Sequence, residues 1–169
     1  MINVKWLSLR IRYYSMQNQG KVQQTPMDEF KQVLRSHSLK ATSQRLMVHK
    51  AMLELGHASA DMVCERLSGS QGGGISVASV YNILTQMAML GVYRHRMSSN
   101  NKMYFDVNTF KHIHLYDSVN NEYKDVIDDE LIALVENRLK DRRFRGYKVD
   151  SVDIQIICHP SGKKTQKRV

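Results

Sequence analysis

The stretch that decides the fold is SVASVYNILTQMAMLGVYRHRMSSNNKMYF at residues 76–105. Its first part, 76–90, begins with Ser76 as the expected N-cap and carries apolar side chains at helical spacing. It ends at Gly91, a residue type common just past a helix end. Its second part alternates apolar and polar residues over 92–97 and 103–105 around a polar turn, which predicts a β-hairpin. A helix followed by such a hairpin is typical of a winged helix-turn-helix, so we expect 76–90 to be the recognition helix.

Three helices are expected before this stretch. The first begins near Asp28, where an acidic residue suits the positive end of the helix dipole. Thr42 predicts the N-cap of the second helix, and Gly56 its end. Ser59 predicts the N-cap of the third, which the Ser68-Gly69 pair ends.

Beyond Thr109 the spacing of apolar residues changes, and the sequence predicts a small domain of strands and one helix. Its expected elements are strands at 112–117 and 122–127, a helix at 129–143 and a strand at 148–157. A domain of this size buries too little apolar surface to be stable alone, so we expect it to pair with a second copy.

The predicted fold class is therefore α+β, with an N-terminal winged helix-turn-helix domain followed by a small α/β dimerisation domain. The predicted segments are a disordered extension over 1–26, the DNA-binding domain over 27–107, the metal-binding dimerisation domain over 108–160, and a basic tail over 161–169.

Composition narrows the function classes. The chain has 169 residues, 42% of them hydrophobic and 24% charged, with a net charge of +9, which is typical of a soluble globular protein. No apolar run is long enough to span a membrane and no secretory signal precedes the first helix, so we expect a cytoplasmic protein. Residues 1–107 hold 13 Lys/Arg against 6 Asp/Glu, whereas residues 108–162 hold 8 against 10. A basic front half suggests that one domain faces a polyanion.

Two histidines carry the best chemical signal. His112 and His114 lie two apart in a predicted strand, so both rings point to the same face, where imidazoles are good ligands for a transition metal. Asp106 precedes them where the chain leaves the hairpin, and Asp125 lies on the neighbouring predicted strand. A bare His-x-His pair also fits a polar strand surface with no metal, and the pair alone does not decide between these alternatives. Four other histidines, His37, His49, His95 and His159, are expected at the surface.

Four segments together resemble the ferric-uptake-regulator family over roughly residues 30–160. They are LKATSQR at 39–45, HASA at 57–60, ISVASVYNIL at 75–84 and KHIHL at 111–115, in the family's order and at similar separations. The resemblance implies a dimeric, metal-dependent transcription repressor that binds a palindromic operator in double-stranded DNA and is not an enzyme.

The resemblance also implies a regulatory metal site made of His57, Asp106, His112, His114 and Asp125. One divalent ion (Fe2+, Mn2+ or Zn2+) bound by all five would fix the angle between the domains, so that two recognition helices in a dimer match successive major grooves.

Two details favour the peroxide-sensing branch of the family. The last ligand is an aspartate, Asp125, and the recognition helix contains Val80-Tyr81-Asn82. In that branch peroxide oxidises the histidines that match His57 and His112, which releases the DNA. Iron, zinc, manganese or haem responsiveness remain alternatives.

One departure from the family concerns its structural zinc, which two Cys-x-x-Cys pairs hold in most members. Here the four positions are Asp117, Asn120, Cys158 and Ser161, so only one ligand remains and we expect no structural zinc held by four cysteines. A constitutive winged-helix DNA binder with a vestigial metal site is therefore an alternative. A hydrolase or oxygenase is disfavoured because no base or nucleophile accompanies the metal ligands.

The candidate DNA contacts all lie in the predicted DNA-binding domain. Lys40 and Arg45 match family positions near the DNA backbone or minor groove. On the recognition helix, Tyr81 can contact a thymine methyl and Asn82 can bond to adenine, although Tyr81 is also placed for core packing. The other candidates are Ser79 on the same helix and, for phosphates, Arg94 and Arg96 in the wing.

Overall fold

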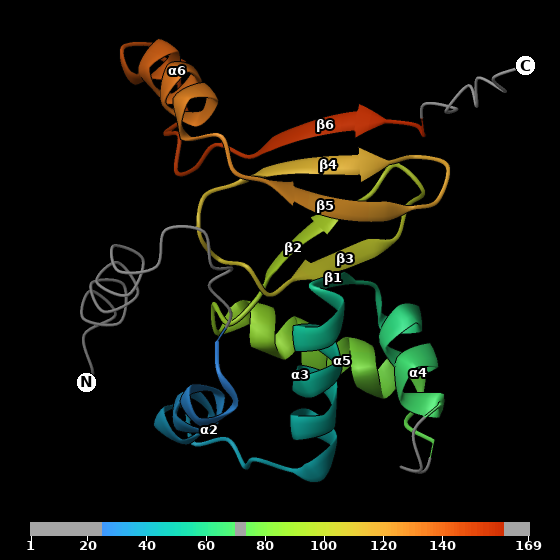
Figure 1. Cartoon of the computed structure of the whole chain (residues 1–169). Coiled ribbons are helices and arrows are strands. Elements are labelled where there is room, and N and C mark those ends of the chain that lie inside the picture. The colour runs from blue at the N-terminus through green and yellow to red at the C-terminus, as the bar shows by residue number, and fades with distance from the viewer. Residues whose placement is uncertain (1–24, 70–73, 161–169) are drawn as a thin grey trace, which may run out of the picture. The chain divides into compact units, whose positions relative to one another are not determined.

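The structure is a computed structural model that describes residues 25–69 and 74–160. The chain divides into two compact units (Figure 1). The first unit contains the chain up to Arg96 together with Met103–Thr109. The second unit contains Met97–Lys102 and the chain from Phe110 onward. Most of the predicted N-terminal extension and the whole basic tail lie outside the described residues. The predicted α+β class is confirmed, with a helical N-terminal unit followed by a small α/β unit.

The first unit has the winged-helix order of elements. Its members are α2 (Met27–Ser36), α3 (Ser43–Leu55), β1 (His57–Ala58), α4 (Ala60–Ser68), α5 (Val77–Met89), β2 (Arg94–Met97) and β3 (Met103–Asp106), with the strands in the order β1-β3-β2. The predicted N-caps are present, since the side chains of Thr42, Ser59 and Ser76 each accept a hydrogen bond from a backbone N–H three residues later. Gly91 has a φ of 74°, as expected of a residue just past a helix.

Helix α5 is amphipathic and is anchored in the core of its own unit. Val80, Leu84 and Met87 are fully buried, whereas Tyr81 and Asn82 on the other side are exposed. The core also contains Phe30 and Leu34 of α2, Val48 and Met52 of α3, and Val63 of α4. Burial of one face therefore orients the polar face of α5, the predicted recognition helix, outward.

His49 lies in the core, so the prediction that it is a surface residue was wrong. Its Nδ1 lies 2.8 Å from the hydroxyl of Tyr93, and its Nε2 lies 2.9 Å from the carbonyl oxygen of Thr25. Its ring stacks on Phe30 with the centroids 3.9 Å apart. Desolvation lowers the pKa of His49 to about 4, despite the opposing effect of the bond to Thr25. The ring is therefore neutral, with Nε2 donating to Thr25 and Nδ1 accepting from Tyr93.

The second unit is a three-stranded sheet with one helix. It contains β4 (Ile113–Asp117), β5 (Glu122–Val126), α6 (Asp129–Lys140) and β6 (Ile154–Cys158). Strand β4 is central, pairing antiparallel with β5 and parallel with β6. Helix α6 ends before the predicted residue 143, and β6 begins later than the predicted 148. The reason is a tight turn in which Tyr147 N donates to Phe144 O and Gly146 has a φ of 81°.

Part of the apolar surface of this unit is left uncovered within one chain. Helix α6 has no buried residue, and Leu134, Ile156 and Ile157 are 56%, 42% and 61% exposed. No described helix is both long and apolar enough to cross a membrane.

Candidate metal centre and DNA-binding face

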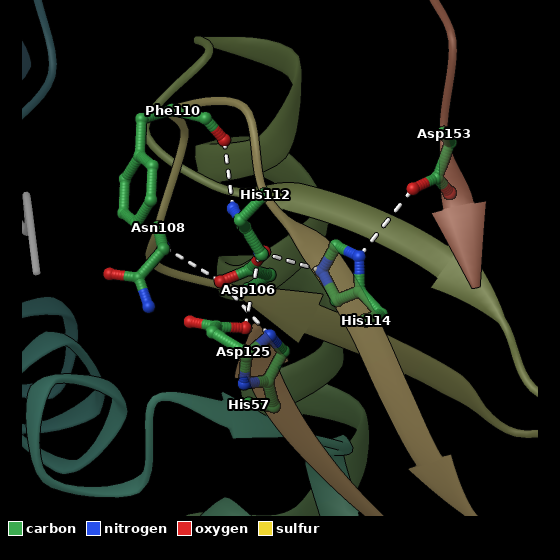
Figure 2. Close-up of polar contacts among 8 residues, drawn as sticks. All are labelled: His57, Asp106, Asn108, Phe110, His112, His114, Asp125 and Asp153. Carbon is green, nitrogen blue, oxygen red and sulfur yellow. Dashed lines mark hydrogen bonds and ion pairs between the residues drawn. The ribbon is translucent and has the colours of Figure 1, made fainter. Parts of the chain in front are cut away.

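The first unit brings together two of the predicted ligands, His57 and Asp106. The two-residue strand β1 pairs antiparallel with β3, and the register places His57 directly opposite Asp106. The Nε2 atom of His57 lies 3.3 Å from Oδ1 of Asp106, and both side chains are buried. Asp106 Oδ1 also accepts a hydrogen bond of 2.7 Å from the backbone N–H of Asn108, which holds the carboxylate in place (Figure 2).

The second unit brings together the other three, His112, His114 and Asp125. The Nε2 atoms of the two histidines lie 2.8 Å apart, and Nε2 of His112 lies 3.1 Å from Oδ1 of Asp125. The register of β4 and β5 places His114 directly opposite Asp125, and His112 lies just before β4. Both imidazoles are buried, and Figure 2 shows them directed toward each other.

Hydrogen bonding defines which nitrogen of His112 faces this cluster. Nδ1 of His112 lies 2.8 Å from the carbonyl oxygen of Phe110, which can only accept, so Nδ1 carries the proton. In the neutral ring Nε2 therefore presents a lone pair, while the carboxylate of Asp125 presents another. Lone pairs this close repel unless a proton or a metal cation lies among them. The donor set thus fits a cation.

Asp153 belongs to the surroundings of this cluster and was not predicted as a site residue. Its Oδ1 lies 3.5 Å from Nδ1 of His114, on the side of the ring away from His112. Carboxylates in this position orient metal-binding histidines and increase their basicity. Asp153 comes just before β6, whose parallel pairing with β4 is not visible in local sequence patterns.

At the positions predicted to match the family's structural zinc ligands, this chain forms hydrogen bonds instead. Asp117 accepts bonds from the backbone N–H groups of Val119 and Asn120 and from the side-chain amide of Asn120. These bonds outweigh partial desolvation, which would raise the pKa of Asp117, and the net effect is to lower it. Ser118 donates to the carbonyl oxygen of Cys158 through both its N–H and its hydroxyl. The ends of β4 and β6 are thereby joined without thiolate ligands, while Ser161 lies outside the described residues.

The candidate DNA contacts on the helices of the first unit differ in exposure. Tyr81 is 42% exposed and meets Phe105 edge-on, so it is only partly engaged in packing. Asn82 and Lys40 are exposed. Ser79 is half-buried, and its hydroxyl lies 2.9 Å from that of the N-cap Ser76.

The guanidinium group of Arg45 is hydrogen-bonded within the first unit. It donates 2.6 Å to the carbonyl oxygen of Lys40 and 2.9 Å to the side chain of Gln86 on α5. It therefore connects the start of α3 to α5. On strand β2, Arg94 is exposed and Arg96 is half-buried.

Comparison with known proteins agrees with this architecture. The model of the ferric uptake regulator family matches residues 36–157. The structure is similar to the ferric uptake regulator of Vibrio cholerae (22% identity, 78% of this chain and 99% of that one, TM-score 0.66) and to that of Helicobacter pylori (16%, 82% and 94%, TM-score 0.65). It is also similar to the peroxide stress regulator of Campylobacter jejuni (25% identity, 78% and 96%, TM-score 0.53). Among curated protein sequences none matches this chain.

Proposed function

Because the chain belongs to the ferric uptake regulator family, we propose that it is a transcription repressor whose affinity for DNA is set by one divalent metal ion. Metal-dependent regulation of transcription is the family's general function. The observation that carries the specific proposal is the cluster of His112, His114 and Asp125, where buried lone pairs converge at 2.8 and 3.1 Å.

The five proposed ligands are divided between the two units. His57 and Asp106 are paired in the first unit, and His112, His114 and Asp125 in the second. We propose that one ion binds all five and so links the DNA-binding unit to the other. Three imidazoles and two carboxylates form a mixed nitrogen and oxygen donor set that suits Fe(II), Mn(II) or Zn(II). The structures of the Pseudomonas aeruginosa and Francisella tularensis regulators, similar in fold, are described as containing manganese and iron.

Linking the units would raise the fraction of molecules competent to bind DNA. A chain whose units rotate freely presents the recognition helix in the required orientation only part of the time, and this lowers its apparent affinity by that fraction. The recognition helix α5 would then contact the major groove through Tyr81 and Asn82. Arg94 and Arg96 in the wing would contact phosphates, with Lys40 and Arg45 near the backbone.

We further propose that the protein acts as a homodimer on a palindromic operator. The uncovered apolar residues of α6 and β6 support this, because exposed apolar clusters on small units mark protein contacts. A two-fold dimer would present two α5 helices to two half-sites.

Peroxide is the proposed signal. The aspartate at position 125 and the Val80-Tyr81-Asn82 segment favour this branch, and the similarity to a peroxide stress regulator agrees with it. His57 and His112 are the ring candidates for oxidation. In the net reaction hydrogen peroxide would give one oxygen atom to an imidazole ring and leave as water, bound Fe(II) would promote cleavage of the O–O bond, and the oxidised ring would be lost as a ligand. Iron, zinc, manganese or haem sensing within the same family is the alternative.

A titration of apo-protein with Mn(II) on a palindromic operator tests the metal dependence. We expect affinity to rise at least tenfold with metal, and His112→Ala to lose this rise while its circular dichroism is unchanged. His37→Ala is the matched control, since His37 is an exposed histidine next to the end of α2 and belongs to neither the proposed metal site nor the proposed DNA contacts. Equal affinity with and without metal would refute the gating and identify a constitutive DNA binder.

Exposure of the Fe(II) form to hydrogen peroxide tests the signal. We expect a mass gain of one oxygen atom on the peptide containing His57 or His112, together with release from DNA. Unmodified peptides with DNA binding retained would exclude peroxide sensing and leave metal availability as the signal.

A further inference from the structure

A cationic turn in the second unit is not used by the proposed metal switch. We define it as residues 138–148, RLKDRRFRGYK, which contain six Lys/Arg and one Asp. Six of the eight Lys/Arg residues between 108 and 162 fall in these eleven positions, whereas acidic residues outnumber basic ones over the whole range. Between residues 108 and 162 the positive charge is therefore concentrated in one segment.

The cations of this turn are exposed and lack ionic partners. Arg142, Arg143, Arg145 and Lys148 are all exposed, and none forms an ion pair with any residue in 25–69 or 74–160. By contrast, Lys111 of the same unit is paired with Glu136. Surface cations left unpaired at this density repel one another, so a bound polyanion would stabilise them.

The turn is also structurally ordered. An isolated β-bridge joins Phe144 to Tyr147, and Tyr147 N donates 2.9 Å to Phe144 O. Gly146 takes the left-handed conformation that this tight turn requires. The turn borders a hollow of about 600 Å³, whose lining contains five Lys/Arg residues together with Glu136 and several apolar residues. The five are Lys140, Arg142, Arg143, Arg145 and Lys148. The backbone that carries Arg142, Arg143 and Arg145 is therefore held in one turn.

We propose that the cationic turn binds the phosphate backbone of double-stranded DNA and adds an affinity that is independent of sequence and metal. This rests on the proposed function only in taking DNA as the polyanion. Arginine suits this role because its planar guanidinium bonds phosphate oxygens in pairs. A small anionic ligand is less well matched, since such ligands are mostly enclosed by their pockets and every cation of the turn beyond Asp141 is exposed.

The test compares two triple variants that change the net charge equally. R142A/R143A/R145A removes the turn's arginines, and K102A/K111A/K124A removes three exposed lysines of the same unit. Binding to a non-operator duplex is measured between about 50 and 200 mM salt without metal. Each phosphate contact contributes about 0.9 to the salt slope, so loss of three lowers it by about 2.7. Between 50 and 200 mM salt the arginine variant should therefore lose affinity by a factor about 40-fold smaller than the wild type does. The salt slope of the lysine variant should stay much closer to that of the wild type.

Two outcomes would overturn the proposal. Equal slopes for the two variants would show that only net charge matters. Saturable binding of ATP to the wild type that is lost in the arginine variant, with the DNA salt slope unchanged, would identify the hollow as a small-ligand site. Circular dichroism confirms that both variants are folded. The metal titration on the operator is repeated with the arginine variant to keep the two proposals separate. Loss of metal gating with a changed salt slope would refute only the proposed metal switch. Retained metal gating with an unchanged salt slope would refute only the role of the cationic turn.

Discussion

Acidification should destabilise the first unit through His49, whose ring is buried against Phe30 and bonded on both nitrogens. In the unfolded chain this residue has the ordinary pKa of 6.5, and in the folded unit the pKa is about 4. Between these values the unfolded state binds a proton that the folded state does not. The free energy of unfolding therefore falls as the pH is lowered through this window.

The size of the effect follows from the pKa difference. Each unit of difference corresponds to about 1.4 kcal/mol, so His49 alone removes about 2 kcal/mol by pH 5 and about 3 kcal/mol by pH 4. This is a large part of the 5–15 kcal/mol that typically stabilises a domain. Above about pH 7.5, one unit above the ordinary pKa, the residue should contribute almost no pH dependence.

Urea unfolding of the metal-free protein, followed by circular dichroism between pH 7.5 and 4.5, measures this effect. His49→Gln retains an amide donor and a carbonyl acceptor but cannot titrate, so its stability should fall less steeply with pH than that of the wild type. His37→Gln is the control, because His37 is an exposed histidine next to the end of α2. Parallel pH profiles for wild type and His49→Gln, or an NMR titration of His49 near pH 6.5, would refute the reasoning.

Further predictions concern the core, base recognition and metal content. Leu84→Ala should lower the free energy of unfolding by about 3 kcal/mol, because Leu84 is fully buried. Met89→Ala, on the exposed side of the same helix, should change it by less than about 0.5 kcal/mol. Urea denaturation measures both values. Asn82→Ala should reduce discrimination between operator and single-base variants at one position by about 1–3 kcal/mol, and uniform weakening at all positions would contradict a base contact. Metal analysis of anaerobically purified protein should find one divalent ion per chain, and a second, zinc, would contradict the hydrogen-bonded role assigned to Asp117.

Local features of the fold were predictable from the sequence. The N-caps at Thr42, Ser59 and Ser76 form as expected, because a cap depends on residues only three positions apart. The length of α6 was overestimated, since Leu139 continues the helical spacing while the turn closed by Gly146 interrupts the structure soon after it. Strand β1 was missed because two residues show no periodicity.

Burial of polar residues was less predictable. A histidine at position 49 looks like any other in the sequence, and only the approach of Tyr93 and Thr25 from distant parts of the chain explains why it is buried neutral. Asp153 was missed as a site residue for the same kind of reason, because its proximity to His114 depends on the parallel pairing of β6 with β4.

The sequence by itself determined the helices, the hairpin and the kinds of side chain available to hold a metal, because spacing, caps and turn residues act over a few positions. Only the tertiary structure decided which ligand atoms meet within each unit. The register of β1 on β3 places His57 opposite Asp106, and that of β5 on β4 places Asp125 opposite His114. Strand register is set by hydrogen bonds and packing between segments distant in the chain, and a slip of one residue would direct these side chains to the other face of the sheet.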